Sequence, residues 1–197
     1  MTKAEPGTSH IPNSWSPDGE ILLFESRKAA TATLIALTLR DKTATPFGSV
    51  QNSRGAIDAA FSPDGRWVVY TSYENNRDDV FVQPFPSTGA KFEIPRLRGP
   101  HAPVWSRDGK ELFYASGPRQ FAVLTIGLPG FTAGNPVSVF MGANNNAPQV
   151  QRVYDIMPDG KHILTFLDPG DPSSPETLQI NVTLNWFEDL KRRVPTR

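Results

Sequence analysis

Four aspartates recur at nearly even spacing along the chain, and carboxylates serve both acid–base catalysis and the binding of hard metal ions. They are Asp18, Asp64, Asp108 and Asp159, separated by 46, 44 and 51 residues. Each precedes a glycine in a short phrase whose fullest form is Ser-Pro-Asp-Gly. An active site does not come in four copies, and the phrase lacks the Asp-x-Asp-x-Asp-Gly pattern of a calcium loop. The pattern therefore predicts a repeated turn, in which proline sets the first corner and glycine accepts a positive φ.

Other residue types that carry chemistry are sparse. The chain has three histidines, His10, His101 and His162, and no cysteine. The histidines lack the paired spacing of a zinc site, and without cysteine there is no thiolate ligand or thiol nucleophile. Neither the Gly-x-Ser-x-Gly phrase of a serine hydrolase nor a glycine-rich phosphate loop occurs. We therefore predict a chain with no catalytic residue, no metal site and no cofactor.

The elements that position the four turns are predicted to be β-strands. A short apolar run follows each glycine, beginning at Ile21, Trp67, Leu112 and Ile163. Runs rich in β-branched and aromatic residues, bounded by turn formers, favour strands over helices. Further candidate strands follow in each unit. Four strands in every unit of about 45 residues are typical of a β-propeller blade.

The sequence thus predicts an all-β fold: one partial β-propeller domain over residues 1–197, with about four blades of four antiparallel strands and an incomplete last blade. The predicted blades span approximately residues 12–48, 56–96, 101–141 and 150–185. Residues 185–194 are predicted to form a short C-terminal helix, because their apolar positions share one helical face. Either Ala4 to Ile11 supplies the missing strand, or the chain is part of a larger propeller.

Composition narrows the classes of partner. The 20 basic and 20 acidic side chains cancel, which removes the electrostatic case for nucleic acid or an anionic membrane surface. No apolar run approaches the roughly 20 residues of a membrane span, and the N-terminus does not resemble a signal peptide. We expect neither nucleic-acid binding nor membrane insertion by this chain.

A binding surface is predicted from position alone. In a propeller, the loops that lead into the innermost strands and those between second and third strands share one face, and function concentrates on such loops. The predicted partner contacts are Asp58, Tyr73, Arg77, His101, Arg119 and Arg152. The tryptophans 15, 67, 105 and 186 could form a stacking platform, but their placement in the blades favours packing between blades.

The four phrases resemble the repeats of TolB-like β-propellers. Residues 61–70, 80–86 and 104–114, and the ending from Leu184 to Pro195, are also similar to the C-terminal propellers of bacterial eukaryotic-like serine/threonine kinases. That resemblance implies a bacterial sensor or binding platform, extracytoplasmic as part of a longer protein. The sequence has no glycine-rich kinase loop, His-Arg-Asp or Asp-Phe-Gly, so kinase activity is not implied.

Three hypotheses for function follow. The first is a non-catalytic module that binds a protein or peptide, or senses a ligand, on the channel face. The second is a propeller lyase or hydrolase, which would show polar groups of perturbed pKa at the mouth of the channel. The third is a structural half-ring that forms a homodimer, or joins missing blades, through its open edges.

Overall fold

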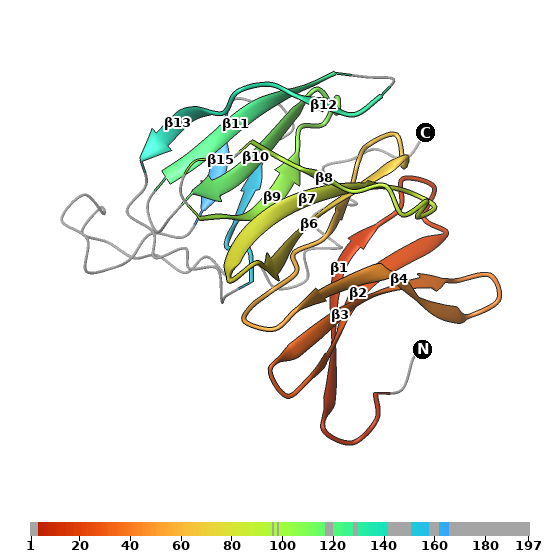
Figure 1. Ribbon diagram of the computed structural model, residues 1–197. Helices are drawn as coiled ribbons and strands as arrows, with labels where there is room; N and C mark the ends of the chain where they lie inside the picture. Colours follow the sequence, from red (N-terminus) through yellow and green to blue (C-terminus); the bar gives the residue numbers. More distant parts are fainter. Residues whose placement is uncertain are drawn as a thin grey trace, which may run out of the picture. The chain divides into compact units, whose positions relative to one another are not determined.

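The computed structural model describes residues 4–95, 97, 99–116, 120–127, 130–141, 151–157 and 162–165. The chain divides into two compact units, Met1–Phe166 and Leu167–Arg197, and every described residue belongs to the first. The described residues form strands and their connections, with no helix among them, which confirms the predicted all-β class (Figure 1). Arg119 and the helix predicted at residues 185–194 lie outside the described residues.

The first two blades are antiparallel sheets whose strands pair in chain order. The first sheet consists of β1 (Thr8–Trp15), β2 (Ile21–Lys28), β3 (Thr31–Thr38) and β4 (Thr43–Asn52). The second consists of β5 (Ala60–Phe61), β6 (Trp67–Glu74), β7 (Arg77–Pro84) and β8 (Phe92–Glu93). Each second strand pairs with the strand before it and the strand after it, as in a propeller blade.

The third and fourth sheets repeat this pattern with changes. The third consists of β9 (Pro100–Trp105), β10 (Glu111–Ser116) and β11 (Gln120–Gly127), with β12 (Thr132–Ala133) and β13 (Val137–Met141) both paired to β11. The fourth pairs β14 (Tyr154–Ile156) with β15 (Ile163–Thr165). Four sheets built in succession from one repeated unit make the described part of the chain a β-propeller array.

The repeated phrase forms the same hydrogen-bonded corner in the first three blades. In the first, Ser16 Oγ donates to Asp18 Oδ1 at 2.5 Å and accepts from the backbone N–H of Ile21 at 2.9 Å. The backbone N–H of the residue after glycine donates to the same aspartate oxygen. Ser62 with Asp64, and Ser106 with Asp108, repeat these bonds. The prediction that these aspartates are turn residues is confirmed for the three described corners.

The corners also contact one another across the blades. Gly65 has φ +73°, and a Cβ built there would lie 3.3 Å from Cδ of Pro17 in the preceding corner. Gly109, with φ +71°, has the same relation to Pro63, at 3.5 Å. The positive φ favours glycine at both corners, and at Gly65 the proline of the preceding blade also leaves little room for a side chain.

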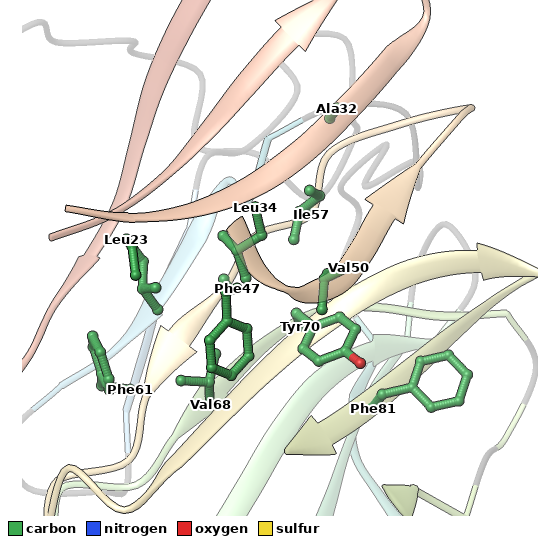
Figure 2. Packing of buried hydrophobic residues seen from close by; sticks show 12 residues of the cluster. Leu23, Ala32, Leu34, Phe47, Val50, Ile57, Phe61, Val68, Tyr70 and Phe81 are labelled. Atoms are coloured by element: carbon green, nitrogen blue, oxygen red, sulfur yellow. The ribbon is translucent and has the colours of Figure 1, made fainter. Parts of the chain in front are cut away.

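The apolar cores lie between successive blades. Between the first and second, Leu23, Leu34 and Phe47 face Val68 and Tyr70, and all are buried (Figure 2). Between the second and third blades a similar cluster joins residues of β6 and β7 to residues of β10. Removal of this apolar surface from water holds blade to blade, because a single sheet cannot bury both of its faces alone.

The tryptophans only partly follow the prediction that they pack between blades. Trp105 is buried in the cluster between the second and third blades, and Trp67 packs at its edge, 5.6 Å from the ring of Phe131. Trp15 is exposed, so the prediction is wrong for this residue. The cause is positional, since Trp15 lies in the first sheet and no described sheet precedes it. Trp186 lies outside the described residues.

Candidate binding site

The segments that lead into the innermost strands, residues 55–59, 99–103 and 151–153, are called here the inner-strand segments. Two of them contain a residue with left-handed backbone at the same place, four positions before the corner serine: Asp58 with φ +48° and Ala102 with φ +51°. Aspartate is among the few side chains that tolerate this conformation well. The kink presents backbone N–H groups of the inner-strand segment to the preceding blade.

Glu25 of β2 receives those N–H groups in the first interface. Its Oε1 accepts from the backbone N–H of Ile57 at 2.9 Å and from that of Asp58 at 3.2 Å, and its side chain is fully buried. Its Oε2 pairs with the guanidinium of Arg27 at 2.8 Å. Arg27 in turn donates to the carbonyl oxygen of Gly55 at 3.2 Å. Glu25 therefore fastens the second blade to the first.

The next interface uses a neutral side chain at the corresponding position. Thr71 lies six residues after its corner glycine, as Glu25 does, and its Oγ1 accepts from the backbone N–H of Ala102 at 3.1 Å. The sequence prediction missed both residues. The signal for Glu25 was an acidic residue directly after the apolar run of β2, where the second repeat has threonine.

Asp58 and Arg152, two of the predicted contacts, meet across 94 positions of sequence. The carboxyl Oδ1 of Asp58 accepts from the backbone N–H of Arg152 at 3.0 Å. Asp58 is only 7% exposed, and burial raises its pKa to about 6. The hydrogen bond from the backbone N–H of Arg152 opposes this increase. The negative charge of Glu25 adds to it, and the positive charges of the Arg152 and Arg27 guanidinium groups oppose it.

A cavity of about 130 Å³ opens beside this pair. It lies where the first, second and fourth sheets meet, and its lining residues are Pro12, Asn13, Asp58, Ala59, Gln151 and Arg152. Asn13 is held in place, because its Oδ1 accepts from the backbone N–H of Ala59 and its Nδ2 donates to Glu25 Oε1. The volume suits one charged or polar head group with a few waters, and is below the roughly 300 Å³ of sites for drug-sized ligands.

Tyr73 and Arg77 lie on the hairpin between β6 and β7. The hydroxyl of Tyr73 accepts from Arg54 at 3.2 Å and donates to Asn76 at 2.8 Å, and the Arg54 guanidinium lies 5.0 Å from the centre of the tyrosine ring. Arg77 forms ion pairs with Asp79 and Glu93 of its own blade. The hairpin therefore presents an aromatic ring and guanidinium groups whose positions are fixed by neighbours.

His101 is, like Asp58, a predicted contact that the structure buries. Its side chain is almost inaccessible, and its Nδ1 lies 2.9 Å from the carbonyl oxygen of Gly99. Burial raises the pKa of nearby Asp78, and its interactions with Arg54 and His101 only partly oppose that increase. Among the described residues, Asp78 Oδ1 is buried without a hydrogen-bond partner. Asp78 is a polar group near the hairpin that the sequence prediction missed.

Within the described ranges, no three His, Cys, Asp or Glu side chains gather closely enough to hold a metal ion. The described residues also contain no helix of a length and apolarity that could span a membrane. The chemistry this site offers is therefore that of its own groups: a carboxyl that titrates near pH 6, two carboxamides and a guanidinium around one small cavity.

No family model matches the sequence. The Tol-Pal system protein TolB of Anaeromyxobacter dehalogenans strain 2CP-C is 31% identical over 78 residues, which are 40% of this chain and 17% of that protein. TolB of Acinetobacter baumannii has a similar structure, with a TM-score of 0.56 and 15% identity, over 80% of this chain and 42% of that one. Hydrazine synthase of Kuenenia stuttgartiensis has a TM-score of 0.55 and 22% identity, over 85% of this chain and 44% of that one.

The chain spans less than half the length of these solved structures, and its sequence match covers about a sixth of the curated TolB. At these identities the structural likeness concerns the fold. None of these three proteins is a kinase propeller, so that part of the sequence resemblance stays a prediction. From the repeated corners, the successive sheets and these likenesses together, the chain has a TolB-like β-propeller fold.

Proposed function

We propose that this chain is a non-catalytic binding module that engages a protein or peptide on the face formed by the inner-strand segments. One observation carries the proposal: segments of three blades converge on a small polar cavity that holds Asp58 and Arg152. The repeated aspartates of the described corners, by contrast, are engaged in turns. Polar groups brought together by a fold without a turn role to explain them are candidates for recognition.

The size of the cavity argues for a macromolecular partner. About 130 Å³ holds one side-chain head group, so most of the contact area must come from the surrounding surface. We infer that the β6–β7 hairpin contributes such surface, where the Arg54 guanidinium lies 5.0 Å from the centre of the Tyr73 ring. Tyrosine and arginine are enriched where protein interfaces gain most of their affinity.

The chemistry of Asp58 indicates which head group would enter. The carboxyl is buried and carries a raised pKa, so its ionised form lacks full compensation. An ammonium or guanidinium group of a partner would supply that compensation and form a charge-assisted hydrogen bond. The partner is therefore a protein or peptide that presents a basic side chain.

The relatives lend support to a protein partner, since TolB is named for a Tol-Pal system. The resemblance to receptor-type kinase propellers supports a sensing role for the same face. On these grounds we also infer an extracytoplasmic location in a bacterium, as part of a longer protein.

Selection of a displayed random-peptide library on the immobilised chain tests the proposal. Enriched peptides are expected to contain lysine or arginine, and to bind Asp58→Asn at least tenfold more weakly than the wild type. Glu20→Gln, an exposed acid beside the first corner, is the matched control and should bind unchanged. Failure to enrich any peptide, or equal binding by wild type and Asp58→Asn, would contradict the proposal.

A second candidate is a propeller lyase or hydrolase, and the pKa of Asp58 is the observation that favours it. A carboxyl that titrates at about 6 can serve as a general acid or base near neutral pH. Nitrophenyl esters, nitrophenyl glycosides and lactones are suitable probes. Turnover with a pH limb near 6 that disappears in Asp58→Asn would replace the binding proposal with this one.

A further inference from the structure

The cavity beside Asp58 and Arg152 is lined by residues that the structure describes, and two of its lining side chains are held in place by other partners. Both ends of the Asn13 carboxamide are engaged, because its Oδ1 accepts from a backbone N–H of the second blade and its Nδ2 donates to Glu25. The Arg152 guanidinium donates to the carbonyl oxygen of Pro103 in the third blade at 3.3 Å. These two side chains therefore form fixed parts of the cavity wall.

Asp58 is the acidic group of this lining, and one of its oxygens is left for a ligand. Its Oδ1 accepts the backbone N–H of Arg152 at 3.0 Å. Within the described ranges, no guanidinium or ammonium group lies within ion-pair distance of this carboxyl, and no residue donates a hydrogen bond to its Oδ2. Gln151, an exposed residue of the same lining, adds a carboxamide oxygen. A ligand in the cavity therefore meets one carboxyl oxygen and one neutral acceptor.

The described charges that act on Asp58 come from two elements. From β2 come Glu25 and Arg27, which are paired with each other at 2.8 Å, and from the segment before β14 comes Arg152. Burial raises the pKa of Tyr154 in β14, so this neighbour stays neutral. Burial is also the largest influence on Asp58 and raises its pKa to about 6. Burial thus favours the neutral carboxyl, whereas a cation bound in the cavity would favour the ionised form.

The acceptors in the cavity suit an ammonium group better than a guanidinium. A guanidinium binds a carboxylate most strongly through two parallel hydrogen bonds, one to each oxygen, but Oδ1 of Asp58 already accepts from Arg152. An ammonium is a compact charge whose three donors need no planar arrangement, so it can bind Oδ2, the Gln151 carboxamide and a water together. About 130 Å³ admits this group with a few waters. The cavity therefore favours the head group of lysine.

We propose that this cavity takes the ammonium group of a lysine side chain in exchange for the proton of Asp58, so that a partner binds at neutral pH and leaves in mild acid. The ammonium stays charged throughout this range, because its ordinary pKa is about 10.4. In the exchange the O–H bond of the Asp58 carboxyl breaks, its electron pair stays on the oxygen, and the proton passes to solvent. The inference rests on the proposed function and adds to it the identity of the basic group and the regulation of the site.

The probe that tests this on the full chain is n-butylammonium chloride, which carries the head group of lysine on a short alkyl chain. Its dissociation constant is measured by NMR titration at pH 5 and pH 7, at constant ionic strength. Binding should be about tenfold weaker at pH 5, because about a tenth of Asp58 is ionised there and about nine tenths at pH 7. At pH 7, n-butylguanidinium should bind about fivefold more weakly than n-butylammonium.

Two variants assign the effect to Asp58. Asp58→Asn should bind n-butylammonium about tenfold more weakly at pH 7, and its affinity should not depend on pH, because the amide does not titrate. Glu20→Gln, which changes an exposed acid beside the first corner, is the matched control and should keep both the affinity and the pH dependence of the wild type. Circular dichroism at both pH values checks that each variant is folded.

Four results would each overturn the proposal: no binding of n-butylammonium at pH 7, equal affinity at the two pH values, a pH dependence that survives Asp58→Asn, or equal binding of n-butylguanidinium. The proposed function is tested separately. A selected peptide that needs Asp58 but binds equally at pH 5 and pH 7 would exclude the proton exchange and keep the binding module. Binding of n-butylammonium as expected, without any enriched peptide, would keep the cation site and contradict only the protein or peptide partner.

Discussion

The backbone N–H of Asp58 donates to Glu25 Oε1 at 3.2 Å, which brings two buried acidic residues of neighbouring blades against each other. The Glu25 carboxylate is compensated by Arg27, by Asn13 and by the N–H of Ile57. Within the described part of the chain, the Asp58 carboxyl accepts the backbone N–H of Arg152. Burial, with the charge of Glu25 adding to it, raises the pKa of Asp58 to about 6.

The pH dependence of stability should report this residue. The pKa of Asp58 is about 6 in the folded chain and about 3.9 when unfolded, so the native state binds the proton more tightly between those values. Stability should therefore fall as pH rises from 4 to 6, by on the order of 2–3 kcal/mol from this group. Asp58→Asn, which suits the left-handed backbone and can still accept from Arg152, should flatten this part of the curve. Urea unfolding from pH 4 to 7 measures the effect, and an unchanged slope in the variant would count against it.

The aspartates of the corners should have the opposite effect to Asp58 on the pH dependence of stability. Hydrogen bonds from Ser106 and from the backbone N–H of Lys110 hold the pKa of Asp108 below its ordinary value, and Asp18 is held low in the same way by Ser16 and Glu20. A carboxylate with a lowered pKa stabilises the fold above its unfolded pKa and loses that effect as pH falls through its folded pKa. Thermal unfolding should therefore show Asp108→Asn less stable than the wild type at pH 7, with the difference shrinking below pH 4. A constant difference across this range would contradict the assignment.

Alanine variants of Gly19 and Gly65 can distinguish the cost of backbone strain from the cost of contact between blades. Gly19 and Gly65 have almost the same φ, +74° and +73°, but only at Gly65 would a Cβ meet the preceding corner, 3.3 Å from Pro17. Alanine should cost about 1–2 kcal/mol at either site because of the left-handed backbone. Gly65→Ala should cost about 1 kcal/mol more, since Pro17 has to shift. Urea unfolding of the two variants gives the difference, and equal losses would mean that the corners do not press on each other.

The fold was predictable because one phrase specifies local and non-local structure together. Serine, proline, aspartate and glycine each have a separate task in the corner, so four copies in sequence predict four equivalent turns between paired strands. The same period predicts which residues of different blades are equivalent. It does not predict whether another blade covers the first one. No described sheet precedes the first blade, so Trp15 is exposed whereas Trp105 is buried.

The candidate site was predictable only in part. Position in the repeat led to Asp58 and Arg152, which do meet. It did not lead to Glu25, whose role depends on N–H groups more than 30 residues away and on a kink visible only in the backbone angles. It also did not distinguish His101, which the structure buries, from Tyr73 on the hairpin. Arg119 remains a prediction, because it lies outside the described residues.

The contribution of Glu25 to holding the first two blades together should be measurable as a change in the free energy of unfolding. Glu25→Ala leaves the N–H groups of Ile57 and Asp58 and the guanidinium of Arg27 without their buried acceptor, at a cost of about 3–5 kcal/mol. Thr71→Val removes one neutral acceptor in the next interface and should cost about 1–3 kcal/mol. Glu20→Ala, exposed beside the corner, is the control and should change the free energy of unfolding by less than about 0.5 kcal/mol.

Glu25→Gln provides a second readout that loss of packing alone would not produce. Its amide oxygen can still accept from Ile57 and Asp58, so the blades stay joined, but the negative charge beside Asp58 is gone. Because that charge helps to raise the pKa of Asp58, its removal should lower the pKa below about 6. Carboxyl titration followed by NMR measures this shift in the folded variant. A pKa that does not move would mean that burial alone sets the value, and that the two acids are neighbours without electrostatic coupling.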